Sequence, residues 1–202
     1  NNFVNGAAAA NILSGAAGIV LQGGDLGAAD PAVARRACEQ LTFRQVGAPA
    51  VRTALLALLA QPLDPFLEHA ADYAAMHTRA FGVRELQASP SVRQQARLLR
   101  IVSQVVTVPA ERAAVYDFAA TALDASEPAL ATNAVVALSQ APDAEARVAK
   151  VFAAWLAEPA MSERRLWAFE RLATPLAGSP AVAQTLRTAL QKPGPVRQVA
   201  LK

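Results

Sequence analysis

Hydrophobic and polar positions between residues 89 and 156 recur with the period of an α-helix. In the first helix of this stretch, polar residues share one narrow stripe, which we expect to face water: Arg93, Arg97, Arg100 and Gln104. The apolar residues fill the remaining arc of roughly 200°, which is wider than the buried stripe of an ordinary amphipathic helix. The pattern therefore predicts a helix that packs against neighbours on more than one side.

The same stretch divides into four predicted helices, over residues 89–106, 109–123, 128–138 and 143–156. Only Thr132 and Asn133 interrupt the apolar run of the third helix, and its alanines allow neighbouring backbones to approach closely. We interpret it as an inner helix. The fourth helix places Val148, Phe152 and Trp155 on one face, opposite its charged residues, as expected of an outer helix with one buried side.

Prolines mark the starts of predicted helices along most of the chain. From residue 31 onward they follow at an average step of about 18 residues, one helix plus one short turn: Pro31, Pro49, Pro65, Pro90, Pro109, Pro128, Pro142, Pro159, Pro180 and Pro195. Proline suits the first helical position because its missing N–H would have had no partner there. Several follow a good N-cap residue, namely Asp30, Asp64, Ser89 and Ser179. The sequence predicts an all-α fold of antiparallel helix pairs stacked as an α-solenoid, with an irregular helical bundle as the alternative.

The residues that follow these prolines also repeat. An apolar residue two positions on, a small residue near six and a leucine near ten fall on one helical face, as in Val33, Ala37 and Leu41 after Pro31. The pattern resembles the helical repeats of the HEAT and armadillo type over roughly residues 30–202. The resemblance implies a curved superhelix, here of roughly five helix pairs, that binds other macromolecules along its inner face. The long step from residue 65 to 90 and an incomplete ladder of Asp and Arg residues depart from the family pattern.

Composition supports the helical prediction. Hydrophobic residues make up 53% of the 202 residues but aromatic residues only 5%, and roughly a quarter of the chain is alanine, the best helix former. Sheet-rich folds are therefore disfavoured. The charged fraction of 17% lies below the usual level of about 25%, so we expect large buried surfaces. A net charge of +3 indicates nucleic acid only weakly.

Residues 1–24 carry no charge, and residues 3–21 are mostly apolar or small. Their length approaches that of a bilayer-spanning helix, but they contain asparagines and glycines and lack a basic start. We favour a buried, alanine-rich first helix, with a partner-binding extension and a membrane-associated segment as alternatives. The helical-repeat domain then covers residues 25–202. Because the chain starts without Met and ends within what reads as another helix, we expect a piece of a longer protein.

One helix contains a cluster of potential metal ligands or acid/base residues: Glu68, His69, Asp72 and His77. His69 and Asp72 are three residues apart and can converge, whereas His77 lies two turns away and about 80° round the helix axis. No established metal-binding spacing accompanies them. We therefore expect a partly solvated polar face and no cofactor, with an α-helical enzyme or metal-binding protein built on these four residues as the alternative.

Cys38 is the only cysteine, which excludes an internal disulfide and a cysteine-based metal cluster. Arg35 and Arg36 beside it could lower its pKa, but a lone helical thiol is more often a packing residue. A single cysteine is compatible with a reducing or an oxidising compartment. Localisation therefore stays open between the cytoplasm and the periplasm.

The repeat pattern and the lack of a catalytic motif predict a non-catalytic protein–protein interaction or scaffolding module. Arg93, Arg97 and Arg100 are its candidate partner contacts, and an acidic protein surface is the partner that they suit. Nucleic acid is less favoured because lysine is scarce and aromatic residues do not alternate with the arginines. Binding of nucleic acid or an acidic partner through this stripe is a second alternative. A membrane role is expected only if residues 1–24 supply it.

Overall fold

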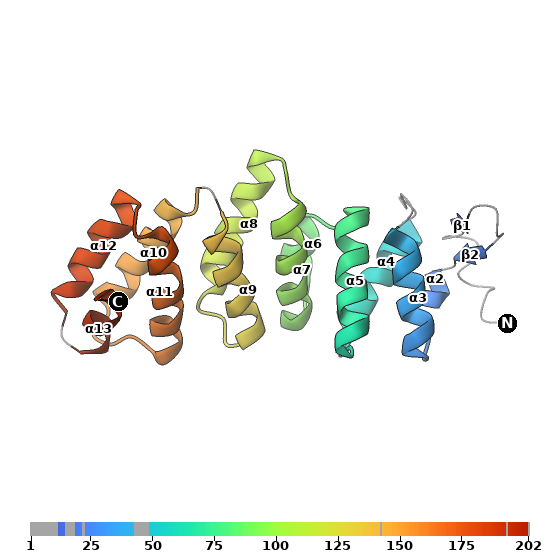
Figure 1. Ribbon diagram of the computed structural model, residues 1–202, viewed down its shortest axis with the longest axis horizontal. Helices are drawn as coiled ribbons and strands as arrows, with labels where there is room; N and C mark the ends of the chain where they lie inside the picture. Colours follow the sequence, from blue (N-terminus) through green and yellow to red (C-terminus); the bar gives the residue numbers. More distant parts are fainter. Residues whose placement is uncertain are drawn as a thin grey trace. The chain divides into compact units, whose positions relative to one another are not determined.

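The computed structural model describes residues 12–14, 19–21, 23–42, 49–141, 143–192 and 194–201. Within them the protein is helical apart from two three-residue strands, β1 (Ile12–Ser14) and β2 (Ile19–Leu21), which pair antiparallel (Figure 1). The all-α fold class is therefore confirmed. The helices are short, and most of their buried residues are alanine, leucine and valine, as the composition indicates.

The chain divides into two compact units, Asn1–Val105 and Val106–Lys202, which we call unit 1 and unit 2. Unit 1 contains α2 (Gly23–Leu26), α3 (Pro31–Thr42), α4 (Pro49–Leu59), α5 (Pro65–Thr78), α6 (Val83–Ala88) and α7 (Val92–Val105). Unit 2 contains α8 (Pro109–Ala122), α9 (Pro128–Ser139), α10 (Glu145–Ala157), α11 (Glu163–Leu176), α12 (Pro180–Leu190) and α13 (Pro195–Ala200).

In unit 1 each long helix contacts the helix after next. α5 packs against both α3 and α7, so these three helices form a continuous layer. On the other side, α2 contacts α4, and Arg52 of α4 pairs with Glu85 of α6. α4 also packs against α5, and α6 against α7, which holds the two sides together.

Unit 2 follows the same rule. α10 contacts α8 and α12, whereas α11 contacts α9 and α13. Contacts between α8 and α9, and between α10 and α11, join the two series. Alternating contacts of this kind arise when successive helices reverse direction and each pair leaves one apolar face for the next pair to cover.

Local sequence explains where most helices begin. Proline is the first residue of α3, α4, α5, α8, α9, α12 and α13, as predicted. Asp64 accepts hydrogen bonds from the backbone N–H groups of Phe66 and Leu67 at 3.0 and 3.1 Å, and Asp30 accepts one from Ala32 at 2.8 Å. These carboxylates satisfy N–H groups that have no partner within the helix.

The helix predicted to start at Pro90 instead begins at Val92. The Ser91 hydroxyl accepts from the Gln94 N–H at 3.4 Å, and the Ser91 carbonyl accepts from the Gln95 N–H at 2.8 Å. Ser91 therefore takes the capping position expected of Ser89. The Ser89 hydroxyl lies inside the fold and donates to Gln94 Oε1 at 2.5 Å.

Each unit has its own core of fully buried side chains. In unit 1 these are mainly leucines, including Leu26, Leu41, Leu55, Leu59, Leu86, Leu98 and Leu99. In unit 2 two aromatic rings join them, since Phe152 of α10 and Phe169 of α11 are both 0% exposed with ring centroids 4.3 Å apart. Trp155 is 3% exposed and completes this cluster 5.8 Å from Phe152.

Most of residues 1–24 lie outside the described residues. The alanine-rich first helix predicted for this segment therefore falls largely outside them as well. The six described residues of β1 and β2 are extended and not helical. Among the described residues, no helix has both the length and the hydropathy to cross a membrane.

Candidate interaction surface

The surface of unit 1 is organised around α5, which lies between α3 and α7. Helical spacing gives α5 two different sides. Phe66, His69 and Tyr73 fall on the side that faces α3, whereas Glu68 and Asp72 fall on the side that faces α7. The first side is open and largely apolar, and the second side is polar and closed.

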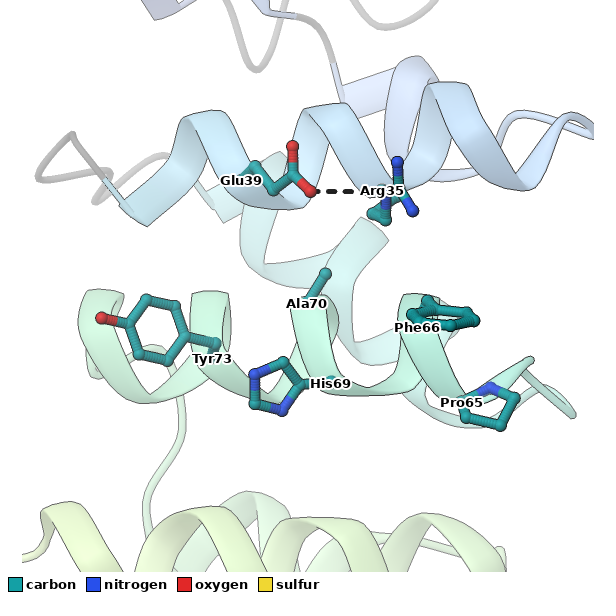
Figure 2. Close-up of a pocket in the computed structure, with 7 residues that line it drawn as sticks. All are labelled: Arg35, Glu39, Pro65, Phe66, His69, Ala70 and Tyr73. Carbon is teal, nitrogen blue, oxygen red and sulfur yellow. Dashed lines mark ion pairs between the residues drawn. The ribbon is translucent and has the colours of Figure 1, made fainter.

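A groove of about 540 Å³ lies between α3 and α5 (Figure 2). Phe66 and Tyr73 stand at either end of the α5 side, and the small side chain of Ala70 lies between them. Arg35 and Glu39 of α3 form the opposite side and pair with each other, Nε to Oε1, at 3.3 Å. Because these two charges compensate each other, the groove offers mainly aromatic and aliphatic surface.

The aromatic residues of α5 are unusually accessible. Phe66 is 73% exposed and Tyr73 45% exposed. The Tyr73 ring lies between two imidazoles one turn away on either side, with centroid distances of 6.3 Å to His69 and 4.4 Å to His77. Stacked rings lose little side-chain freedom when they bind, so this row of rings is suited to contact with another molecule.

On its other side, α5 is joined to α7 by Arg97, which is only 7% exposed. Its guanidinium donates to the Leu59 carbonyl at 2.9 Å, to the Gln61 carbonyl at 2.7 Å and to Glu68 Oε2 at 3.0 Å. Gln94, one turn earlier, donates to the Leu56 carbonyl at 2.6 Å. These contacts satisfy carbonyls at the C-terminal end of α4, where a cation is also favoured by the helix dipole.

Arg100 continues the network one turn further along α7. It donates to Glu68 Oε1 at 2.7 Å and to Asp72 Oδ2. Burial disfavours the charged form of Glu68, but the hydrogen bonds and charges of Arg100 and Arg97 outweigh it and hold the pKa of Glu68 below its ordinary value. For Asp72 the balance is reversed, because burial raises its pKa to about 6 despite the charge of Arg100. Asp72 Oδ1 is buried and has no hydrogen-bond partner in the part of the chain that the structure describes.

The buried carboxyl of Asp72 predicts a pH effect on stability. Its pKa of about 6 in the folded state exceeds the ordinary 3.8, so the folded protein binds more protons between these values, and the free energy of unfolding falls as pH rises through them. At about 1.4 kcal/mol per pKa unit, the loss from pH 4 to 7 is about 2 to 3 kcal/mol. Asp72→Asn should remove this loss. Urea unfolding followed by circular dichroism at both pH values measures it.

Asp117→Asn is the matched control, because Asp117 is an exposed partner of Arg147 in unit 2. This variant should keep the pH dependence of the parent protein. An Asp72→Asn variant with the same loss of stability from pH 4 to 7 as the parent would show that Asp72 does not titrate in this range.

The arginine stripe predicted from the sequence does not face water as a whole. Arg97 is buried and is engaged by α5 and by the end of α4, whereas Arg100 is engaged by α5. The prediction that the stripe is solvated is wrong for Arg97. Arg93 is exposed and has no ionic partner among the described residues, so it is the member of the stripe left for a partner.

The four candidate ligands on α5 do not converge. Glu68 and Asp72 bind the α7 arginines, whereas His69 and His77 lie with Tyr73 on an exposed side. No group of three or more His, Cys, Asp or Glu residues in the described part of the chain could hold a metal ion. The two carboxylates serve as internal partners of arginine.

Cys38 is fully buried in α3. Burial, helped by the nearby charge of Glu39, raises the pKa of its thiol to about 12. Since the thiolate is the reactive form, Cys38 packs as a small apolar residue at neutral pH.

Unit 2 has its own polar link around Asp124, which follows α8. Asp124 accepts from Trp155 Nε1 at 3.1 Å and from Arg165 Nε at 2.7 Å, and Arg165 also pairs with Glu158 at 2.6 Å. The guanidinium of Arg165 lies 5.6 Å from the centre of the Trp155 ring. Burial disfavours the charge of Asp124, but these hydrogen bonds keep its pKa below the ordinary value. The cluster joins α10 and α11 to the segment that follows α8.

Sequence reasoning missed the groove. Its signal was present on α5, where Phe66, His69, Tyr73 and His77 share one arc of the helix, beside the arc of the buried Leu67, Ala71 and Ala74. An aromatic residue away from the apolar stripe of a helix indicates an exposed ring. The other wall could not be predicted, because α3 precedes α5 by more than twenty residues and no local pattern joins them.

Comparison with known proteins gave no match, whether to family models, to curated proteins or to solved structures. The function is therefore inferred from the residues of this chain and their contacts.

Proposed function

We propose that this protein is a non-catalytic interaction module, built as an α-solenoid of helix pairs, that binds a segment of a partner protein on the α3–α5–α7 layer of unit 1. The alternating contacts of both units support the solenoid arrangement. The groove between α3 and α5 supports the binding role, and the exposed Phe66 at its edge is the observation that carries the proposal.

The expected occupant is a bulky apolar side chain of the partner. The groove has aromatic ends and a floor made by Ala70, and its two charged residues already neutralise each other. Aromatic residues that stay exposed in a free protein are typical anchors of protein interfaces, where a few residues carry most of the binding energy. Exposed apolar surface with a polar rim is a common feature of interaction sites.

The polar network on the other side of α5 supports the same role. Arg97 and Arg100 fix α7 against α5 through hydrogen bonds to Glu68, to Asp72 and to two carbonyls at and just after the end of α4. A helix held in this way presents its opposite side in one conformation. Less conformational entropy is then lost when a partner binds.

Selection of short random peptides on the immobilised, intact chain tests the proposal. Enriched peptides should contain a Trp, Phe or Leu, and Phe66→Ala should weaken their binding about tenfold or more, as expected of an interface anchor. Val108→Ala is the matched control, because Val108 is 51% exposed and lies in unit 2. Isothermal titration with the synthesised peptides gives the affinities.

Enriched peptides that bind Phe66→Ala as tightly as the parent protein would contradict the proposal. So would a selection that enriches no peptide dependent on an apolar residue.

A further inference from the structure

The acidic residues of unit 1 are occupied by internal contacts. Asp30 and Asp64 cap α3 and α5. The remaining carboxylates pair with arginines or are otherwise engaged: Glu39 with Arg35, Glu68 with Arg97 and Arg100, Asp72 with Arg100, Glu85 with Arg52, and Asp25 in a further interaction. Each carboxylate of unit 1 thus already has a contact, and among the described residues none forms an ion pair with the remaining arginines.

Four exposed arginines of unit 1 have no acidic partner among the described residues: Arg36, Arg79, Arg84 and Arg93. Unit 2 differs, because exposed carboxylates such as Glu111, Glu127 and Glu163 have no ionic partner within its described part. With nine arginines against seven carboxylates, unit 1 has a formal charge of +2, whereas unit 2 has +1, so the unit that holds the groove is the more basic of the two.

Three of these arginines surround α5. Arg36 lies on α3 and Arg93 on α7, the two helices that flank α5. Arg93 is one turn before Arg97, which contacts the loop that leads into α5, so Arg93 lies toward the Phe66 end of the helix. Arg79 ends α5 in the left-handed conformation, at φ 49°. Each helix of the α3–α5–α7 layer therefore carries, or ends at, an exposed arginine that has no acidic partner among the described residues.

We propose that the segment bound in the groove is acidic, with one bulky apolar side chain inserted between Phe66 and Tyr73 and flanking carboxylates that meet Arg36, Arg93 and Arg79. This inference rests on the proposed function and adds the charge of the partner to it. Carboxylates are the natural ligands of guanidinium groups, and complementary charge raises the rate of encounter and excludes basic competitors. A protein segment fits better than nucleic acid, because the groove between the charges is apolar and the arginines do not follow one line.

A set of matched peptides and one nucleic acid test this inference on the intact chain. Each peptide carries one Phe, flanked by Glu, by Ser or by Lys residues, and a Glu-flanked peptide with Ala in place of Phe completes the set. Oligothymidylate is the nucleic acid. Fluorescence anisotropy at low and physiological salt gives the affinities.

At low salt the Glu-flanked Phe peptide should bind about tenfold more tightly than the Ser-flanked one, since each exposed ion pair contributes about a twofold to fivefold effect. Physiological salt should reduce that advantage. The double variant Arg36→Gln/Arg93→Gln should remove most of it while leaving the Ser-flanked peptide unaffected. Arg171→Gln is the control and should leave the affinities of all the peptides unchanged. Arg171 is an exposed arginine of unit 2 with no ionic partner among the described residues.

Three outcomes would overturn the inference, and they differ in what they leave standing. Equal affinity for Glu-flanked and Ser-flanked Phe peptides removes the acidic partner but keeps the apolar groove as a binding site. Failure of every Phe peptide to bind removes the proposed function as well. Oligothymidylate that binds more tightly than the Glu-flanked peptide, and through Arg36 and Arg93, assigns the same cations to nucleic acid.

Discussion

Arg97→Ala is expected to lower the free energy of unfolding of unit 1 by about 3 to 5 kcal/mol, the range for breaking a buried ion pair by removing one partner. The substitution leaves the carbonyls of Leu59 and Gln61 and one oxygen of Glu68 without the donor that now serves them. The Leu59 carbonyl is the buried acceptor among them, and a buried acceptor without a partner carries the full cost of its desolvation. Urea unfolding followed by far-ultraviolet circular dichroism measures the loss.

Arg93→Ala is the matched control, because Arg93 occupies the same stripe of α7 but is exposed and has no ionic partner among the described residues. Its free energy of unfolding should change by no more than about 0.5 kcal/mol. Equal effects of the two substitutions would mean that Arg97 is not an internal partner of α4 and α5.

Phe152→Ala is expected to destabilise unit 2 by about 3 to 5 kcal/mol, because it opens a cavity in a fully packed core. Phe152 is 0% exposed and contacts the rings of Phe169 and Trp155. Both tryptophans, Trp155 and Trp167, belong to unit 2, so tryptophan fluorescence reports the unfolding of this unit. The urea midpoint of the fluorescence transition should fall accordingly.

Val136→Ala in α9 provides the control for this prediction, since Val136 is 43% exposed and its truncation leaves no closed cavity. A Phe152→Ala midpoint within error of the Val136→Ala midpoint would contradict the packing of the aromatic cluster.

The parts of the fold that depend on local chemistry could be predicted from the sequence. Asp64 followed by Pro65 specifies a helix start, because the carboxylate caps free N–H groups and proline needs no partner for its nitrogen. Pro90 shows the limit of this reasoning. Two serines flank it, and the Ser89 hydroxyl bonds to Gln94, a side chain that also reaches α4, which leaves the capping position to Ser91.

The side of a helix that faces water could not be predicted for α7. Spacing alone identified the stripe that contains Arg93, Arg97 and Arg100, but arginine is usually exposed. Arg97 is buried because Glu68 and the carbonyls after α4 satisfy its donors, and these groups lie some thirty residues earlier in the chain. Pairings over that distance leave no periodic signal.

The same contacts explain why the ligand cluster on α5 was ambiguous. Glu68 and His69 are neighbours in sequence, yet their side chains lie on different sides of the helix, one toward α7 and the other beside the groove. The cluster of four candidate ligands, which is defined by closeness in sequence, therefore contains residues of two separate surfaces. One holds unit 1 together, and we propose that the other binds a partner.

The claim that the groove between α3 and α5 is the docking surface is tested most directly by nuclear magnetic resonance of the intact, isotope-labelled chain during titration with the Glu-flanked Phe peptide. We expect the largest shifts for the amides and side chains of Phe66, Ala70 and Tyr73 on α5 and of Arg35 and Glu39 on α3. The resonances of unit 2 should stay in place. Shifts centred on unit 2, or spread evenly over both units, would contradict the assignment of the binding site to this groove.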